Sequence, residues 1–478
     1  MQANLFVFDV GSTYTKLTAF RLSQGALEFV ARAQAPTTIA DIEIGVLHAK
    51  QALVQKGVEV SSDAALFSTS SAAGGLRMVA LGYMPRVTAK AAKEVAMSAG
   101  ARVLEIISYE DPPDYRLQVL REIKPDIVLL AGGTDGGDQD SLIENGQIIV
   151  QSKIKAVVII AGNKDAQGQV ADILESGGVS YIQVQNVMPT IHELKVKPAR
   201  EAIHEQFIKQ ITRAKGLNKL LNIVTDNKVT PTPGAVFLGA ELLAKGTFQE
   251  AGVGDILVID IGGATTDIHS IMPELDKLTI EEKGLVVTNE KQPSYRTVEG
   301  NLGLRVSATG IVEAIGPLGV LGKIRRKDEE LAEQLVQYAA FLEKNPEYIS
   351  QLPMEKEFDL ALAIGAIEVA LKRHAGYVSQ EFNPVLGIIP GTPIGRDLRR
   401  VKYVIAVGGI FTHRTVEETQ FILAEAFKNP GISLLPAKPL FIVDQQYLLY
   451  ALGAVGQKHG DACIKFAKDH FKVKERGN

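Results

Sequence analysis

"VFDVGSTYTK", residues 7–16, is an apolar run that ends in an acid, a glycine, several hydroxyl side chains and a lysine. Taken alone, this pattern fits either a hairpin with a polar turn or a hairpin that binds phosphate. In the second interpretation, Asp9 lies at the edge of a sheet and Gly11 lets the backbone approach an anion. The side chains that donate hydrogen bonds or add positive charge are then Ser12, Thr13, Thr15 and Lys16.

A second copy of this pattern, "LVIDIGGATTDIHSI" at residues 257–271, favours the phosphate interpretation. Asp260 follows Asp9 at an offset of 251 residues, and Asp267 falls at the same offset from Lys16. Each copy reads as an apolar strand, an acid, a glycine turn and a second strand. An internal repeat of this kind indicates a duplicated architecture. The sequence therefore predicts a duplicated α/β fold in which two hairpins grip phosphates between them.

The composition limits the classes of function. A chain of 478 residues that is 46% hydrophobic should form at least two domains with large cores. The net charge is −4 and no Lys/Arg cluster forms a stripe, so nucleic acid is not an expected partner. The single cysteine, Cys463, excludes a disulfide within the chain. Residues 1–11 do not read as a signal peptide and no apolar run approaches about 20 residues, so we expect no membrane span and a cytoplasmic location.

Apolar runs between the two hairpins predict an inserted domain. Near-continuous apolar segments at residues 126–133, 156–163 and 180–187 alternate with helical stretches, which is typical of a parallel sheet buried on both faces. We expect residues 1–111 to form the first half of the core, residues 112–228 the inserted α/β domain, and residues 229–478 the second half. "LLAGGTDGGD" inside the insertion resembles a phosphate turn, but a tight strand-to-helix turn explains it better because the acid is replaced by Ala131.

Several helices are predicted from apolar spacing and composition. Ile44, Leu47 and Leu53 lie near helical spacing in residues 41–56. A helix over residues 444–457 carries small residues that allow a second helix to cross it closely. The other helices expected are residues 87–98, 165–176, 234–245, 328–342 and 360–379. The scattered histidines His192, His204 and His374 are expected on helix surfaces and show no metal-site spacing.

The order of the motifs resembles the superfamily of actin, sugar kinases and heat-shock chaperone ATPases. Two acid–glycine hairpins are followed by the apolar strand "YVIAVGGIFTH" (residues 403–413) and then by the small-residue helix. The resemblance implies a ribonuclease H-like fold in two halves around a nucleotide cleft. It also implies that residues 407–409 are the adenosine motif and that segments near 70–74 and 452–456 connect the halves.

The resemblance also implies a role for each motif residue. Asp9 and Asp260 would hold a hydrated Mg²⁺, a cation that keeps waters and needs only one or two carboxylates. Asp267 would orient or deprotonate the attacking water, although a turn-capping role for it stays open. Gly408 and Gly409 would lie against the ribose and the α-phosphate of ATP. The residues that would bind the remaining phosphates are Gly11, Ser12, Thr13, Thr15, Lys16, Gly262, Gly263 and Thr265.

Within the superfamily, the chain resembles the MutL family, also called GlmL, which is unrelated to the DNA mismatch repair protein of the same name. The likeness rests on "FDVGSTYTK", "STSSAAGGLRMVA", "VLLAGGTDGG", "IDIGGATTD" and "AVGGIFTH" in this order. It implies an ATP-binding, ATP-hydrolysing accessory protein that reactivates an adenosylcobalamin-dependent aminomutase such as glutamate mutase. The partners would then be the mutase subunits, and the cofactors ATP and Mg²⁺. The sequence does not predict an oligomeric state, and no Asp-x-His-x-x-Gly motif specifies cobalamin.

Other classes remain open. A small-molecule kinase or a hydantoinase-like ATP-dependent hydrolase would use the same cleft. An activator of 2-hydroxyacyl-CoA dehydratases needs cysteines for an iron–sulfur cluster, and Cys463 alone does not supply them. An actin-like filament is disfavoured by the large insertion, which would burden a repeating contact surface.

Overall fold

The structure is a computed structural model that describes residues 1–11, 14–36, 42–70, 76–83, 95, 101–190, 195, 197–212, 224–225, 229–273, 293–383, 387–412 and 414–474. The strands are β1 (Gln2–Val10), β2 (Tyr14–Ser23), β3 (Ala26–Pro36), β4 (Glu59–Ser70), β5 (Leu76–Gly82), β6 (Ala101–Ser108), β7 (Ile127–Leu130), β8 (Val157–Ile160), β9 (Tyr181–Gln183), β10 (Val229–Pro231), β11 (Ile256–Ile261), β12 (Thr266–Ile271), β13 (Ser294–Glu299), β14 (Tyr377–Asn383), β15 (Gly387–Ile394), β16 (Tyr403–Val407) and β17 (Leu440–Val443). The helices are α1 (Ile42–Gln55), α3 (Pro113–Ile123), α4 (Asp140–Ser152), α5 (Lys164–Ser176), α6 (Lys197–Thr212), α8 (Thr232–Lys245), α10 (Ala308–Ile315), α11 (Pro317–Gly322), α12 (Glu329–Lys344), α13 (Pro353–His374), α14 (Gly409–Thr412), α15 (Val416–Phe427) and α16 (Leu449–Phe471).

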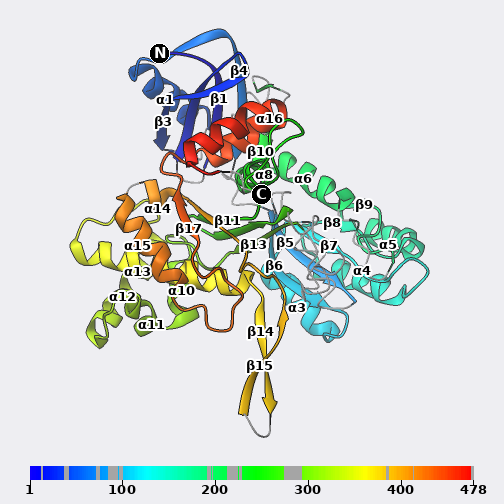
Figure 1. Cartoon of the computed structure of the whole chain (residues 1–478). Helices are drawn as coiled ribbons and strands as arrows, with labels where there is room; N and C mark the ends of the chain where they lie inside the picture. The colour runs from blue at the N-terminus through cyan, green and yellow to red at the C-terminus, as the bar shows by residue number, and fades with distance from the viewer. Residues whose placement is uncertain are drawn as a thin grey trace.

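Two five-stranded sheets share one strand order. The first is β3-β2-β1-β4-β10 and the second is β13-β12-β11-β16-β17. In both, three strands form an antiparallel meander, and the next two strands in that half's core add in parallel on the other side of the first strand. This repeated order confirms the predicted duplicated, actin-like α/β fold. Figure 1 shows the first sheet in the upper lobe and the second below it.

Helices α8 and α16 lie between the two sheets and share one core with both. That core joins Val7 of β1 and Val258 of β11 to apolar side chains of the two helices. The helices cross where neither has room for a side chain: a Cβ on Gly239 would lie 2.2 Å from the Leu449 carbonyl oxygen, and one on Gly453 would lie 1.9 Å from the Ala235 carbonyl oxygen. The close crossing predicted from the small residues is therefore confirmed.

A third sheet, with strand order β6-β5-β7-β8-β9, is parallel throughout and forms the inserted unit. It lies at the lower right of Figure 1. Residues 76–108, which contain β5 and β6, were expected in the first half of the core, yet β5 pairs with β7, so this sheet begins at Leu76 and not after residue 112. The chain leaves the first core sheet at the end of β4 and returns in β10, which pairs with β4.

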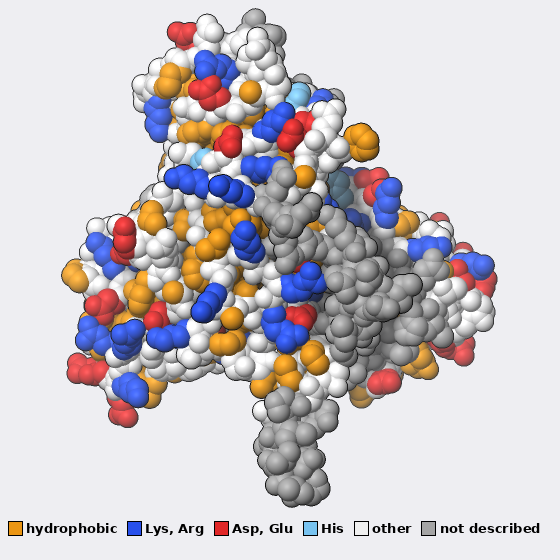
Figure 2. Space-filling model, in the orientation of Figure 1, with side chains coloured by type: hydrophobic (Ala, Val, Ile, Leu, Met, Phe, Trp, Pro, Cys, Tyr) orange, Lys and Arg blue, Asp and Glu red, His pale blue; other side chains and the backbone are white. Residues whose placement is uncertain are grey.

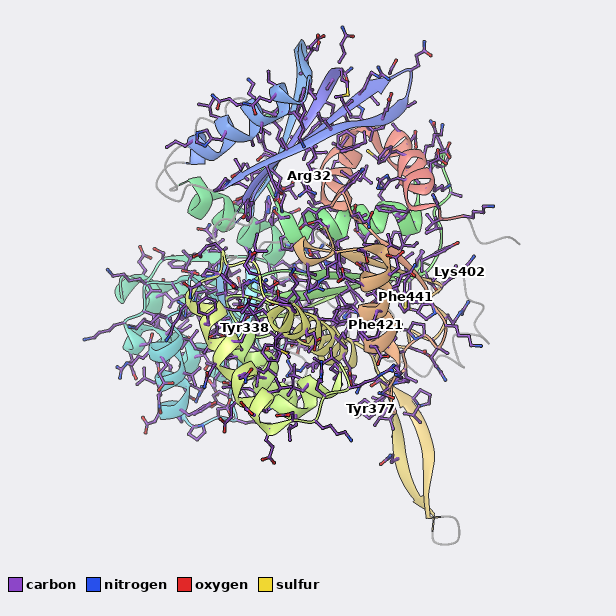
Figure 3. The ribbon with its side chains drawn as sticks, turned by 90° about the vertical axis from the view of Figure 1, so that its left-hand side faces the viewer. Arg32, Tyr338, Tyr377, Lys402, Phe421 and Phe441 are labelled. Atoms are coloured by element: carbon purple, nitrogen blue, oxygen red, sulfur yellow. The ribbon has the colours of Figure 1, made fainter. Side chains whose placement is uncertain are left out.

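Strands β14 and β15 form a separate two-stranded arm. They pair only with each other among the strands that the structure describes, and the arm projects from the body at the bottom of Figure 1. Figure 3 shows Tyr377 at its base, where the ring is 46% exposed. β15 contains Pro390 and Pro393, which face Gln380 and Val378 of β14.

Three helices differ from the sequence prediction. Helix α16 begins at Leu449, so residues 444–448, expected to be helical, precede it. In α1, Ile44 and Leu47 point to solvent, whereas Ala49 and Leu53 are buried, so the predicted apolar face was only partly right. Helix α13 ends at His374, and residues 377–379, expected to be helical, lie in β14. His374 is 3% exposed and bonds Thr297 and Ser270 through its two ring nitrogens, so its predicted surface position was wrong.

Other expectations fall outside the described residues. They are His192 and, apart from Val95, the helix at 87–98. Within the described part of the chain, no helix is both long enough and apolar enough to cross a bilayer. On the face shown in Figure 2, positive and negative side chains are interspersed in the upper lobe and in the lower parts of the molecule.

Candidate functional site

The first hairpin presents Asp9 and Lys16 on the same face of the first sheet. They are cross-strand partners in the β1–β2 register, and Lys16 Nζ lies 3.0 Å from Asp9 Oδ2. The Gly11 amide donates to the Tyr14 carbonyl at 3.0 Å and closes the turn. A Cβ on Gly11 would lie 2.6 Å from that carbonyl oxygen, so only glycine fits the turn without a shift. Ser12 and Thr13, expected to bind phosphate, lie outside the described residues.

Two threonine hydroxyls hold the other oxygen of Asp9. Thr69 Oγ1 of β4 donates to Asp9 Oδ1 at 2.9 Å, and Thr232 Oγ1, at the start of α8, donates to the same atom at 2.6 Å. Asp9 is 1% exposed and is therefore a buried carboxylate with three partners. Hydrogen bonds to a buried charge are costly to remove, so its orientation is fixed by three different elements.

The second hairpin repeats the turn of the first. The Gly262 amide donates to the Thr265 carbonyl at 2.8 Å, and Asp260 and Asp267 are cross-strand partners. Asp267 Oδ2 accepts from Thr265 Oγ1 at 3.2 Å, and Asp267 Oδ1 accepts from Arg296 of β13 at 3.0 Å. Asp267 therefore has two side-chain partners and a fixed orientation beside Asp260.

Asp260 has a strongly perturbed titration. Its burial and, next, the charge of Asp267 raise its pKa to about 8. Lys16 and Arg296 act in the opposite direction, and Asp9 adds a smaller upward contribution. Because Lys16 and Asp9 belong to the first hairpin, the pKa of Asp260 in the second hairpin responds to charges of the first.

Tyr447 lies between the two hairpins. Lys16 Nζ is 4.3 Å from the centroid of its ring, a cation–π distance. Burial, followed by the charges of Asp260 and Asp9, raises the Tyr447 pKa well above its ordinary value. Its backbone has φ 51°, an uncommon conformation for a residue other than glycine. Asp444 supports this turn, because its Oδ2 accepts from the amides of Leu448 and Leu449 at 2.6 and 2.8 Å.

The glycine pair after β16 lies beside the second hairpin. Gly408 has φ 131°, and a Cβ there would lie 2.2 Å from the Ile261 carbonyl oxygen, next to Asp260. Gly409 is exposed, and a Cβ there would meet nothing within 4 Å. Gly408 therefore allows a close backbone approach, while Gly409 leaves open space in front of the backbone where a ligand can lie.

Thr15 lies away from the cluster formed by Asp9, Lys16, Asp260, Asp267 and Tyr447. It pairs with Val10, one position from the Asp9–Lys16 pair, so its side chain emerges on the opposite face of the sheet. A Cβ added to Gly45 of α1 would lie 3.1 Å from Thr15 Oγ1. The side chain of Thr15 therefore faces α1, and its predicted contact with phosphate was wrong.

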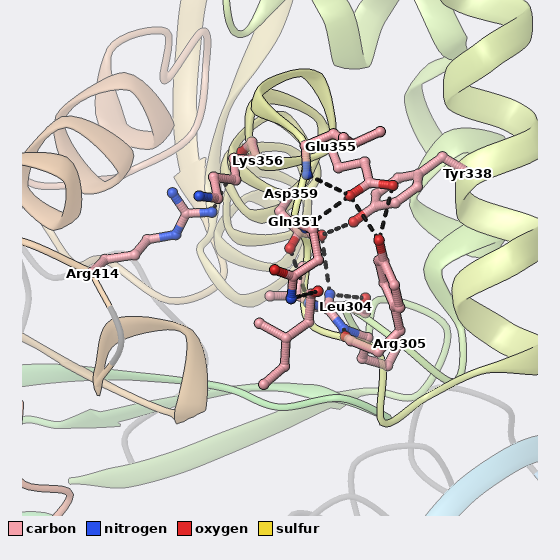
Figure 4. A network of polar contacts seen from close by, with 11 residues as sticks. Leu304, Arg305, Tyr338, Gln351, Glu355, Lys356, Asp359 and Arg414 are labelled. Carbon is pink, nitrogen blue, oxygen red and sulfur yellow. Dashed lines mark hydrogen bonds and ion pairs between the residues drawn. The ribbon is translucent and has the colours of Figure 1, made fainter.

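An ion pair behind the second hairpin supports its turn (Figure 4). The amide of Arg305 donates to the Gly263 carbonyl at 2.8 Å. Its guanidinium binds both oxygens of Asp359 on α13, at 3.1 and 2.9 Å, and Tyr338 of α12 donates to Asp359 at 3.2 Å. Gly263 and Thr265 thus belong to a turn that is tied to two helices of the second half.

The cluster has the donor chemistry of a hydrated Mg²⁺ site. Within the described residues, no three His, Cys, Asp or Glu side chains are placed to hold a metal directly. Mg²⁺ usually needs only one or two carboxylates, with waters and substrate phosphates completing its shell. Asp9 and Asp260 fit that requirement, and a divalent cation would offset the burial that keeps Asp260 protonated.

Four residues of the cluster were not predicted from the sequence: Thr69, Thr232, Arg296 and Tyr447. Thr69 and Thr232 reach Asp9 across 60 and 223 residues of chain. No local pattern signals such contacts. Thr69 could have been located only by predicting that β4 pairs in parallel with β1, because that pairing places Thr69 opposite Asp9.

Comparisons with known proteins give a clear relationship by sequence. A family model described as MutL protein matches residues 5–471. "Protein MutL" from Clostridium tetanomorphum is 37% identical over 473 residues, which cover 97% of this chain and 98% of that protein. Glycerol kinase from Plasmodium falciparum, solved with ADP, is 8% identical with a TM-score of 0.33 over 100% of this chain and 94% of its own. Gluconate kinase from Lactobacillus acidophilus is 10% identical with a TM-score of 0.31 over 98% and 90%. TM-scores this low add nothing to the strand order described above.

Proposed function

This chain belongs to the MutL protein family, and on that basis we propose that it binds Mg²⁺-ATP between its two hairpins and hydrolyses it. One observation carries the proposal: two copies of one acid–glycine hairpin place Asp9 and Asp260 close enough to interact electrostatically. A duplicated pair of buried carboxylates beside a lysine suits a polyphosphate with its cation.

The residues of the cluster divide the work. Asp9 and Asp260 hold the hydrated cation, which neutralises charge on the phosphates when it is bound. Lys16 adds a positive charge 3.0 Å from Asp9 Oδ2. The turn amides of both hairpins and the open space at Gly409 accommodate the nucleotide. Asp267, oriented by Arg296 and Thr265, positions the attacking water and accepts its proton.

Binding is tested by thermal unfolding with and without ATP and Mg²⁺. A ligand at 100 times its dissociation constant adds about 2.7 kcal/mol to the free energy of unfolding. We expect stabilisation by Mg²⁺-ATP in the parent, less in Asp260→Asn, and an unchanged response in Asp397→Asn, a half-buried carboxylate that pairs with Arg399 outside the site. No stabilisation of the parent at millimolar Mg²⁺-ATP contradicts the proposal. Phosphate release without an added substrate supports hydrolysis, whereas release only with an added small molecule supports a kinase or hydantoinase-like reaction.

The client in this proposal is an adenosylcobalamin-dependent aminomutase such as glutamate mutase, and the chain acts as its reactivating accessory protein. The support is the motif resemblance together with membership of the MutL family. The test is recovery of activity by an inactivated mutase after addition of this chain, Mg²⁺-ATP and fresh adenosylcobalamin. Recovery that is equal without ATP, or with Asp260→Asn, argues against the role.

The inserted unit is the part that we propose to contact this client, because the core fold does not require it. A deletion must respect the observed sheets: removing residues 113–226 would take β7, β8 and β9 and leave β5 and β6 without their sheet. Residues 72–227 are a better choice, with a short Gly/Ser linker between β4 and β10. We expect ATP hydrolysis to survive and reactivation to fail. Reactivation by the truncated chain would place the client surface elsewhere.

A further inference from the structure

The two ends of the inserted unit lie next to Asp9. The chain departs after Ser70, the last residue of β4, and re-enters the core sheet in β10, where Ser70 and Pro231 are partners in the ladder. Thr69 comes directly before Ser70, and Thr232 comes directly after Pro231. The two threonines that hold Asp9 therefore lie in the core, one residue before the insertion departs from β4 and directly after the strand by which it returns.

Both hydroxyls converge on a single atom. Thr69 Oγ1 and Thr232 Oγ1 lie 2.9 and 2.6 Å from Asp9 Oδ1, and all three residues are buried. Lys16 occupies Oδ2. Two of the three side chains that hold Asp9 thus come from the core segments to which the ends of the insertion attach.

Thr232 also begins α8, which leads through the Gly239–Gly453 crossing to β11 and Asp260. The helix is continuous from Thr232 to Lys245, and β11 follows it in the chain. The backbone of Thr232 is therefore part of the first turn of the helix that joins the two hairpins.

We propose that Thr69 and Thr232 are positioning residues that couple the state of Asp9 to the inserted unit. This inference rests on the proposed function, because Mg²⁺-ATP is the ligand that would change how Asp9 is held. When a bound cation shares the Asp9 carboxylate, its bonds to the two hydroxyls weaken, and the ends of β4 and β10 respond together. By reciprocity, if Mg²⁺-ATP changes the affinity of the insertion for a partner by some factor, that partner changes the affinity for Mg²⁺-ATP by the same factor.

A purely structural role predicts something different. If the threonines only satisfy a buried carboxylate, their removal lowers stability and disturbs Asp9, but the insertion does not respond to Asp9 through them. The measurement must therefore follow the insertion itself. Amide hydrogen exchange of α3 and β7 does so in the full-length chain.

The experiment compares Thr69→Val with Thr232→Val and their double variant, with Thr69→Ser and Thr232→Ser as conservative controls. Valine keeps the shape and removes the hydroxyl, whereas serine keeps the hydroxyl. Thr309→Val is a matched control. Thr309 also donates its hydroxyl to a carboxylate, that of Glu343 at 2.5 Å, but this pair lies outside the site. Hydrogen exchange is measured without ligand, with Mg²⁺-ATP, and without ligand in the Asp9→Asn background.

In the chain with both threonines, we expect Mg²⁺-ATP to change amide hydrogen exchange in α3 and β7. We expect Asp9→Asn, without nucleotide, to change it as well. In the double valine variant both responses fall at least fivefold, while Mg²⁺-ATP binding by calorimetry weakens less than tenfold. The serine variants and Thr309→Val keep both responses. The serine variants also keep the test decisive if the valine variants fail to fold, since the loss of both responses with serine contradicts a role for the hydroxyls.

The Asp9→Asn measurement separates this inference from the proposed function. If the parent binds no Mg²⁺-ATP by calorimetry, the proposed function fails, and the nucleotide-free comparison still tests the link. Unchanged exchange in α3 and β7 on Asp9→Asn in the parent overturns the coupling, and so does an undiminished response in the double valine variant.

Discussion

Asp9 and Asp260 occupy the same position in two copies of one hairpin, but the residue across the hairpin is a cation for Asp9 and an acid for Asp260. Lys16 is the cross-strand partner of Asp9, and Asp267 is the cross-strand partner of Asp260. Asp9 is therefore an ion-paired carboxylate, while Asp260 has a second carboxylate beside it and a pKa raised to about 8. The two halves share the turn geometry of the hairpin but differ in charge: the first holds an ion pair and the second a pair of acids.

Asp267→Asn should slow ATP hydrolysis far more than it weakens ATP binding. Asparagine keeps an acceptor for Arg296 but cannot take a proton from water. General-base removal costs about 10²–10⁴-fold, so we expect kcat to fall at least about a hundredfold with KM nearly unchanged. Steady-state phosphate release measures both constants. A kcat equal to that of the parent would leave Asp267 as a structural partner of Arg296 and Thr265.

The free energy of unfolding should depend on pH through Asp260. In the folded state this carboxyl keeps its proton up to about pH 8, whereas its ordinary pKa is 3.8. The folded state therefore binds more protons than the unfolded chain in this window, and stability falls as pH rises from about 4 to about 8. Asp260→Asn cannot ionise and should flatten this fall. Thermal unfolding of both chains from pH 5 to 9 without metal checks it, with Asp397→Asn as the control that keeps the parental slope.

Gly408→Ala and Gly409→Ala should separate folding from ligand binding. Gly408→Ala places a methyl group against the Ile261 carbonyl at a φ that alanine rarely adopts, so the chain should lose stability. Gly409→Ala meets nothing in the folded protein and should leave the unfolding temperature unchanged. It should nevertheless weaken ATP binding by about tenfold or more, which is about 1.4 kcal/mol. Undiminished ATP affinity in Gly409→Ala by calorimetry would place the nucleotide elsewhere.

Gly453→Ala should destabilise the whole core, because its methyl group would overlap the Ala235 carbonyl where α16 crosses α8. Overpacking costs about 1–3 kcal/mol or more when backbone must move. Gly168→Ala is the matched control: it is an exposed position in α5 with nothing within 4 Å, and alanine there should be about 0.5–1 kcal/mol more stable. Denaturant unfolding measures both. Equal stability of Gly453→Ala and the parent would mean that the helices separate at little cost.

Much of the site could be predicted because its signal is local and repeated. The acid–glycine hairpins, the Gly408–Gly409 strand end and the small-residue helix each lie within about fifteen residues. The Thr15 error arose within the same motif, because a one-residue step along a strand reverses the face of the sheet. The pairing of Asp9 with Lys16 implies that Thr15 points away from both.

The remaining errors concern contacts between distant segments. Strands β5 and β6 are as apolar as core strands, and only their pairing with β7 assigns them to the insertion. The bonds from Thr69 and Thr232 to Asp9, and from Arg296 to Asp267, depend on which strands become neighbours. His374 was expected on a helix surface with the other scattered histidines, but Ser270 and Thr297 bond its ring inside the fold.

The β14–β15 arm has a consequence for how the chain behaves at high concentration. A bare two-stranded ribbon offers unpaired backbone groups along both edges, which invites a second molecule to add a strand and start aggregation. Pro390 and Pro393 remove two amide donors from β15, so that strand cannot continue a regular ladder. The prolines thus act as a solubility safeguard on the most protruding part of the molecule. We expect their replacement to increase self-association through this arm.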